Sequence, residues 1–227
     1  MADDDQIPGD KISLEGRIKD KLVAKKERDA AEGRHLTGEY VPEHRRLPPG
    51  QHRVEKWPVL DLGITPNVPK EAFRLEVRGA IDNPVSWDWA AFMAQPQVEM
   101  TSDIHCVTSW SLYDMRWAGI SARHLLSIVK PKPEAHHVLF VSYDNYTTNV
   151  RMSDFDDDDV IVAHSWNSQP LAKDHGGPVR IVIPKRYFWK SAKWVNRIVF
   201  MERDMRGYWE ERGYHNEADP WEEERYA

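Results

Sequence analysis

The single cysteine of the chain is the first residue that could do chemistry. Cys106 lies in the segment Asp-Ile-His-Cys-Val-Thr-Ser-Trp, at the end of a run that alternates like a strand. A thiol nucleophile needs a base, but neighbours on a strand point to opposite faces, so His105 is badly placed to activate Cys106. A metal ligand needs no base, because the metal itself favours the thiolate. The alternative is a cysteine buried in the core without a chemical role.

A second candidate site surrounds a Gly-Gly-Pro turn. His175 and Arg180 flank this turn in the segment Asp-His-Gly-Gly-Pro-Val-Arg, residues 174–180. The glycines allow the backbone to approach a ligand closely. A guanidinium group binds phosphate through two parallel hydrogen bonds, so Arg180 at the start of a strand suits an anion. The alternative is a tight turn that carries a surface arginine.

A third candidate site is the segment Trp-Lys-Ser-Ala-Lys-Trp, residues 189–194. Its serine hydroxyl and backbone N–H groups could position a phosphate, and its two lysines, Lys190 and Lys193, could neutralise the charge. The segment comes directly before a run of apolar residues that reads as a buried strand. The alternative is a solvated basic loop without a ligand.

The elements that must position these residues are mostly strands. Short alternating or apolar runs predict strands over 73–81, 98–107, 136–144, 159–166, 178–184 and 194–204. Helices are predicted over 86–94, with Ser86 as the N-cap, and from Ser121 through Val129. Strands outnumber helices, which indicates an α+β, strand-rich domain with a mixed sheet.

The two ends of the chain differ from this domain. Residues 11–32 read as a highly charged helix with a thin apolar stripe, and several prolines follow. We therefore predict a charged helix and extended arm over 1–45 and a single domain over 46–227. The last 22 residues, 206–227, carry five aromatic side chains, and we expect this tail to pack on the domain.

Composition limits the partners. The 227 residues carry a net charge of −6, which argues against a nucleic-acid partner. The sequence contains no apolar run long enough for an integral membrane segment and no recognisable export signal. One cysteine allows no internal disulfide, which fits a reducing compartment. We therefore expect a cytoplasmic protein.

Taken together, the motifs resemble the oxidoreductase molybdopterin-binding family, which contains the sulfite oxidases and the periplasmic protein-methionine-sulfoxide reductases. The resemblance runs from about Pro58 to the C-terminus and fits a short, cytosolic-looking bacterial group best. It is carried by His-Cys-Val-Thr-Ser-Trp-Ser around Cys106 and Arg-Trp-Ala-Gly-Ile at 116–120. It also rests on His-Gly-Gly-Pro-Val-Arg at 175–180, Lys-Ser-Ala-Lys-Trp at 190–194 and the aromatic, acidic tail. Several motifs in one order are far more specific than any one of them.

The resemblance implies a fold of the sulfite oxidase molybdopterin-binding type and a site for molybdenum-molybdopterin. The cofactor would be a single pyranopterin without a nucleotide, and no haem is expected. Cys106 matches the molybdenum ligand, Tyr146 matches a tyrosine of the substrate pocket, and Arg116 matches an arginine beside the ligand segment. The residues that match pterin and phosphate contacts of the family are Lys56, Ser142, Asp144, His175, Arg180, Ser191, Ala192 and Lys193.

The implied activity is two-electron oxygen-atom transfer, as in sulfite oxidation or in sulfoxide and N-oxide reduction. A thiolate and a dithiolene are soft donors that suit such a metal. A small-molecule or sulfoxide substrate is expected, together with a separate electron carrier or redox partner. One alternative is a molybdopterin carrier without turnover, in which Tyr146 would be dispensable. Another is a metal-free interaction module, which would have no need of Cys106, Arg180 or Lys193. For Tyr146 itself, the alternative is a tyrosine packed at a hairpin turn.

Overall fold

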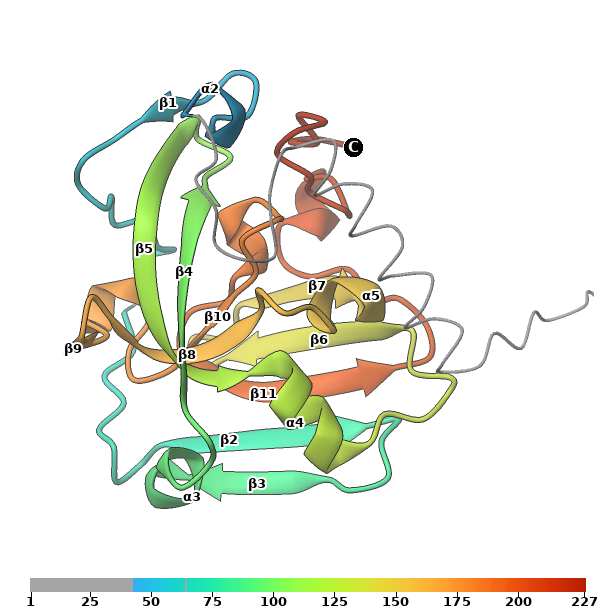
Figure 1. Ribbon diagram of the computed structural model, residues 1–227. Helices are drawn as coiled ribbons and strands as arrows, with labels where there is room; N and C mark the ends of the chain where they lie inside the picture. Colours follow the sequence, from blue (N-terminus) through green and yellow to red (C-terminus); the bar gives the residue numbers. More distant parts are fainter. Residues whose placement is uncertain (1–42, 64) are drawn as a thin grey trace, which may run out of the picture. The chain divides into compact units, whose positions relative to one another are not determined.

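Two β-sheets form the framework of the protein (Figure 1). The computed structural model describes residues 43–63 and 65–227, all of which belong to one compact unit. The predicted helix over 11–32, and the predicted arm up to residue 42, lie outside the described residues.

The first sheet carries the candidate metal ligand. It has the strand order β1-β5-β8-β10, and in addition β4 pairs with β5 and β9 pairs with β8. Only the β1–β5 pair is parallel. The strands are β1 (His52–Arg53), β4 (Val98–His105), β5 (Trp110–Ser121), β8 (Ile161–Trp166), β9 (Gln169–Pro170) and β10 (Arg180–Val182).

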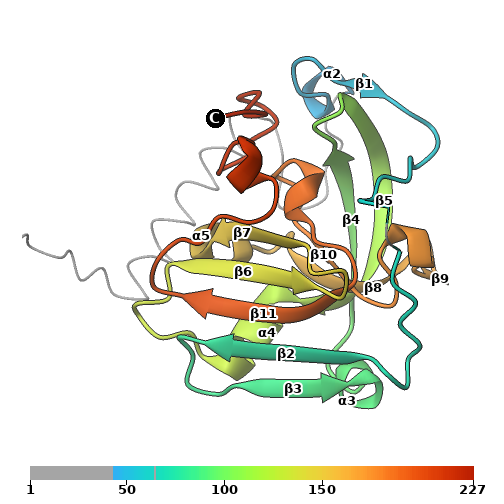
Figure 2. The same ribbon diagram turned by 180° about the vertical axis from the view of Figure 1, so that it is seen from behind.

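The second sheet is mixed, as the sequence predicts. Its order is β3-β2-β11-β6-β7, and Figure 2 shows these five strands side by side in that order. The central strand β11 runs parallel to β2 and antiparallel to β6, so Ile198 is paired with Val77 on one side and Phe140 on the other. The strands are β2 (Arg74–Gly79), β3 (Val85–Asp88), β6 (His137–Ser142), β7 (Thr147–Arg151) and β11 (Val195–Met201).

The described helices are short. Ser121 caps the longest, because its hydroxyl accepts a hydrogen bond from the His124 N–H at 3.2 Å. The α-helices are α2 (Glu43–Arg46), α3 (Trp89–Met93), α4 (Ala122–Val129) and α5 (Met152–Phe155). Three single 3-10 turns complete the set: η1 (Lys173–His175), η2 (Phe188–Lys190) and η3 (Glu210–Arg212).

One sequence prediction of secondary structure is wrong, and the strands β1, β5, β7 and β9 were not predicted. The segment 86–94 is not all helix: β3 continues through Asp88, and Asp88, not Ser86, caps α3 by accepting the Ala91 N–H at 2.8 Å. The strand β5 was not predicted, although it is the longest described strand. It has neighbours on both sides, and Trp110 through Tyr113 are all buried, so its first four residues do not alternate and the alternation begins only at Asp114.

The core is divided between the two sheets. The larger apolar cluster packs the second sheet and α4 against one face of the first sheet and includes Phe73, Leu125, Val162 and Ile198. A second cluster lies on the first sheet and includes Ile104, Cys106 and Trp117. Tyr187, Trp189 and Ala218 form a third, so the C-terminal tail packs on the domain as expected. Within the described part of the chain, no helix has the length and apolar character needed to cross a membrane.

Candidate cofactor site

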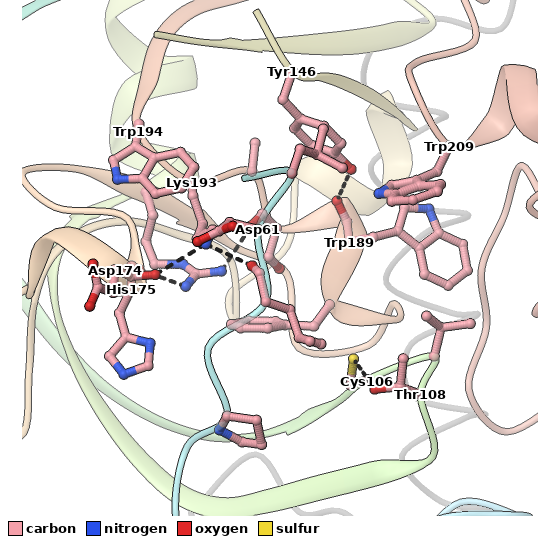
Figure 3. A pocket seen from close by; sticks show the side chains of 18 of the residues that line it. Asp61, Cys106, Thr108, Tyr146, Asp174, His175, Trp189, Lys193, Trp194 and Trp209 are labelled. Atoms are coloured by element: carbon pink, nitrogen blue, oxygen red, sulfur yellow. Dashed lines mark hydrogen bonds between the residues drawn. The ribbon is translucent and has the colours of Figure 1, made fainter. Parts of the chain in front are cut away.

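A cavity of about 300 Å³ brings most of the predicted site residues together (Figure 3). This volume is at the lower end of the range for small-molecule sites. The walls come from the loop after β1, the β4–β5 turn, the β6–β7 turn, η1, the segment around η2 and the C-terminal tail. The lining side chains are Trp57, Pro58, Leu60, Asp61, Leu62, Cys106, Val107, Thr108, Trp110, Asp144, Tyr146, Asp174, His175, Arg180, Phe188, Trp189, Ser191, Ala192, Lys193, Trp194, Trp209 and Tyr214.

Cys106 opens the turn that joins β4 to β5. Its N–H donates to the Trp110 carbonyl at 2.8 Å, and its carbonyl accepts the Ser109 N–H at 3.0 Å. The thiol lies 3.2 Å from the Thr108 hydroxyl and is 7% exposed. His105 points away from it, because its Nδ1 lies 2.8 Å from the Ser111 hydroxyl and its ring does not line the cavity. The base-activated nucleophile therefore has no support in this geometry.

Burial raises the pKa of the Cys106 thiol, while the Thr108 hydroxyl and the charge of Arg225 lower it. Desolvation has the largest effect, so the thiol of the cofactor-free protein stays protonated at neutral pH and is a poor free nucleophile. A bound cation would reverse this balance, because coordination favours the thiolate. The site therefore suits a metal ligand better than a nucleophile.

Arg180 is a buried cation without a carboxylate partner among the described residues. Its two terminal nitrogens donate to the carbonyls of His175 at 2.8 Å and Ser191 at 2.9 Å. Its guanidinium lies over the Phe188 ring, 4.2 Å from the centroid. Burial lowers the pKa of Arg180 to about 9. Buried charges are normally paired, so this geometry leaves room for an anion.

Lys193 supplies a second cation at the same end of the cavity. Its ammonium group donates to the carbonyls of Leu60 at 2.8 Å and Asp174 at 3.1 Å. Burial, and then repulsion by Arg180, lower its pKa to about 8. Burial and the same two cations lower the pKa of His175 to about 4, so this imidazole is neutral at pH 7. The His175 ring stacks on Trp57 with 3.8 Å between centroids.

The segment after η2 lies beside these cations. The Ser191 hydroxyl accepts the Ile183 N–H at 2.9 Å, and the Ala192 carbonyl accepts the Ile181 N–H at 2.9 Å. Both residues are buried and line the cavity. The glycines of the Gly-Gly-Pro turn serve protein contacts, since a Cβ at Gly176 would meet the Lys193 side chain at 3.0 Å. The turn therefore packs directly against the segment that carries the second cation.

Tyr146 and Asp144 reach the cavity from the β6–β7 turn. The Tyr146 hydroxyl donates to the Trp189 carbonyl at 2.7 Å, and burial raises its pKa well above the ordinary value (Figure 3). The Tyr146 hydroxyl therefore donates its hydrogen bond to the protein in this structure. Asp144 accepts the Tyr146 N–H at 3.1 Å, and burial raises the pKa of this carboxyl group.

Three predicted site residues lie elsewhere. Lys56 is exposed, and it is the neighbouring Trp57 that lines the cavity. Ser142 is buried at the end of β6, and its hydroxyl has no hydrogen-bond partner among the described residues. Arg116 is exposed on β5 opposite Thr101, away from the Cys106 turn, and lines a separate hollow of about 150 Å³. Sequence order alone could not distinguish a residue beside the site in the chain from one beside it in space.

Other lining residues were missed by the sequence analysis. Asp61, Thr108, Trp209 and Tyr214 belong to no recognised site motif, and only the aromatic richness of the tail drew attention to the last two. The Cys106 thiol and the charged side chains lie on different sides of the cavity. Figure 3 shows Cys106 with Thr108 on one side and Asp174, His175 and Lys193 on the other.

These residues fit a molybdopterin. Arg180, which has no carboxylate partner among the described residues, suits its phosphate. Lys193 donates to two backbone carbonyls, although the charges of Asp61, Asp144 and Asp174 also act on it. The flat side chains of Trp57, Phe188 and Trp189 suit a planar ring system, and a thiol lies at the far side for the metal. The donor set is therefore consistent with an anionic, planar cofactor whose metal takes sulfur ligands.

Comparison with known proteins decides the family. Residues 62–209 match the family described as oxidoreductase molybdopterin binding domain. The chain belongs to the oxidoreductase molybdopterin-binding family. Its cofactor is molybdenum-molybdopterin, as the sequence predicts, and the predicted family and strand-rich fold are also confirmed. The form of the cofactor, one pterin without a nucleotide, stays a prediction.

The chain spans a different fraction of each relative's length. It is 37% identical over 183 residues to an uncharacterized oxidoreductase, YuiH, from Bacillus subtilis, covering 80% of this chain and 92% of that protein. It is 24% identical over 181 residues to the catalytic subunit MsrP of the Campylobacter jejuni protein-methionine-sulfoxide reductase, covering 70% of this chain and 61% of that protein.

One solved structure supports the fold alone. The sulfane dehydrogenase SoxCD of Paracoccus pantotrophus superposes with a TM-score of 0.56 at 21% sequence identity, covering 61% of this chain and 40% of that chain.

Proposed function

We propose that the protein is an oxidoreductase that transfers an oxygen atom between water and a small substrate in a two-electron reaction, with Cys106 as the thiolate ligand of molybdenum. The observation that carries the proposal is the arrangement of the cavity. Its only thiol within the described residues lies across from two cations, Arg180 and Lys193, whose hydrogen bonds there go to backbone carbonyls rather than to carboxylates.

Each wall of the cavity has a task in this proposal. Arg180 and Lys193 hold the phosphate, and the carbonyls of His175 and Ser191 fix the direction of the guanidinium. Trp57 and Phe188 cover the planar part of the ligand and exclude water. Cys106 supplies a soft donor to the metal. When bound, the cofactor supplies the redox change and the oxygen transfer.

The substrate side of the cavity favours an uncharged molecule. The side chains contributed by the Cys106 turn and the tail are Val107, Thr108, Trp209 and Tyr214, none of which carries a charge at pH 7. A sulfoxide or N-oxide fits such a surface better than the sulfite anion, whose burial needs cations. The sulfoxide reductase among the relatives supports the same class. Electrons would come from a separate carrier.

One observation favours the alternative of a molybdopterin carrier without turnover. The hydroxyl of Tyr146, predicted to face the substrate, donates to the Trp189 carbonyl. A carrier needs the cations and Cys106 but no such hydroxyl group, whereas an enzyme needs groups that act on the substrate.

The test is the substitution Cys106→Ser in protein purified with its molybdenum. Sulfite, sulfoxides and N-oxides are first screened against the unaltered protein with an artificial electron carrier. The variant should keep its pterin but lose turnover, and X-ray absorption at the molybdenum edge should show one sulfur ligand fewer. An unchanged metal environment would refute the assignment of Cys106. Full occupancy without turnover on any substrate would favour the carrier.

A further inference from the structure

The turn that carries Cys106 is held by side chains from both sides of the matched family region. Gln51 donates through Nε2 to the Cys106 carbonyl at 3.0 Å. Arg225 donates through Nη1 to the Val107 carbonyl, and the same nitrogen lies 3.2 Å from the Ser109 hydroxyl. Residues 51 and 225 both lie outside the segment 62–209 that matches the family. The contacts therefore belong to parts of this chain that the family match does not describe.

We propose that Arg225, with Gln51, is a positioning residue that fixes the Cys106 turn and so sets the place of the sulfur in the cavity. The proposal rests on the proposed role of Cys106 as the metal ligand. Neither Arg225 nor Gln51 lines the cavity, so both act through the turn rather than on the cofactor or the substrate.

The turn has a backbone that gains from such support. Ser109 has a φ of 70°, in the left-handed region that a residue with a side chain adopts at a cost. Within the turn, a hydrogen bond from the Ser109 N–H to the Cys106 carbonyl closes the loop. The Val107 carbonyl and the Ser109 hydroxyl are left for another donor, and the guanidinium of Arg225 provides it for both groups.

Arg225 is itself held in place. Its side chain is 16% exposed, and the guanidinium lies 5.1 Å from the centroid of the Tyr187 ring. Its carbonyl accepts the His215 N–H at 3.2 Å, and the next residue, Tyr226, is paired with Tyr214, which lines the cavity. The tail therefore presents a fixed cation to the turn rather than a mobile surface side chain.

Gln51 extends the support to the end of β4. Its side-chain amide oxygen, Oε1, accepts a hydrogen bond from the Ser111 hydroxyl at 3.2 Å, and that hydroxyl lies 2.8 Å from the Nδ1 of His105. The residue before Cys106 is thus fixed through Ser111, and the residues after it are fixed through Arg225. Cys106 lies between two anchored neighbours.

The first experiment uses the fact that the chain has one cysteine. The full chain, produced without cofactor, is treated with a thiol reagent, and the labelling rate is followed to its plateau at high pH, so that differences in thiol ionisation do not enter. Arg225→Met should label about 10- to 100-fold faster than the unaltered protein, because charge-assisted hydrogen bonds that restrain the turn are lost. Arg225→Lys keeps the charge and one donor, so its rate should lie between the two.

The control is Arg212→Ala in the same tail. Arg212 donates to the Tyr208 carbonyl at 2.8 Å and lies over the Tyr208 ring, without contact to the turn. It should label like the unaltered protein. Circular dichroism checks that every variant is folded, and Gln51→Ala gives a second, independent loosening if Arg225→Met does not fold.

The second experiment uses the protein loaded with molybdenum. At equal metal content, Arg225→Met should change the electron paramagnetic resonance signal of the one-electron-reduced metal, which reports the geometry of its thiolate ligand, and Arg212→Ala should not. Labelling rates and spectra in Arg225→Met and Gln51→Ala that match the unaltered protein would overturn the proposal. A spectrum unaffected by Cys106→Ser would instead overturn the role of Cys106, whatever the labelling of the cofactor-free protein shows.

Discussion

Replacing Arg180 with methionine tests whether this residue binds the cofactor or stabilises the fold. Burial lowers the pKa of Arg180 to about 9. At about 1.4 kcal/mol per pKa unit, keeping the charged form buried costs the folded protein about 4–5 kcal/mol. This cost is fully present below pH 9 and is relieved as the pH rises through that value. Methionine removes it and fills part of the same space.

The substitution also has a cost of its own. It removes the donors to the carbonyls of His175 and Ser191, and each unsatisfied carbonyl costs about 1–3 kcal/mol. The two effects nearly cancel, so we expect the cofactor-free variant to unfold within about 2 kcal/mol of the unaltered protein. Retention of the cofactor should behave differently. Loss of one charge-assisted contact to the phosphate weakens binding by about 1.5–3 kcal/mol, or about 10- to 150-fold.

Urea unfolding of the cofactor-free protein and pterin fluorescence after gel filtration measure the two quantities. Arg186→Met is the matched control, because the Arg186 side chain is only 11% exposed but is paired with Asp154 and Asp219 at 2.9 Å each. Breaking that pairing should cost stability, by about 3–5 kcal/mol, without a direct effect on cofactor affinity. If Arg180→Met loses comparable stability and yet retains its full complement of pterin, the anion site has been misplaced.

Two further predictions concern the same cavity. Lys193, with a pKa of about 8, binds phosphate in its protonated form, so cofactor affinity should weaken about tenfold between pH 7 and pH 9 as the proton is lost. Dissociation constants measured across this range should show the trend, and Lys193→Arg, which stays charged, should flatten it. An equal pH dependence in that variant would point to another group, such as Arg180 with its pKa of about 9. Tyr146→Phe leaves the Trp189 carbonyl without its donor and should lower the free energy of unfolding by about 1–2 kcal/mol, with less than a tenfold fall in kcat/KM. A fall of about a hundredfold or more at unchanged stability would show that the hydroxyl turns to the substrate in the loaded enzyme.

Local signals in the sequence predicted part of this structure well. A strand with one exposed face, such as β2, alternates visibly, and Ser121 marks the start of α4. The first four residues of β5 are all buried and do not alternate, which obscured the start of this strand. At Trp89 the chain changes from strand to helix without a proline or glycine, so the segment 86–94 read as one element.

The candidate site was predicted best where one motif supplies the contacts. Arg180 and Lys193 both lie in short motifs, and the structure brings them to the same end of the cavity. Arg116 shows the limit of this reasoning. It lies in a recognisable motif near Cys106 in sequence, but the antiparallel pairing of β4 with β5 places it several residues along the hairpin from the turn. Asp61 and Arg225 reach the site only through the fold, and no local pattern marks them.

The mixed origin of the cavity walls has a consequence for how the protein acquires its cofactor. Trp57 and Tyr214, near the two ends of the described sequence, face the same space, and the Cys106 turn lies between them in the chain. Contacts between such distant segments form late in folding, because the entropy cost of closing a long loop comes before these contacts stabilise the chain. No half-folded chain can therefore offer the cations, the thiol and the aromatic walls at once. Only the fully folded protein can therefore bind the cofactor, and a bound pterin stabilises that state alone.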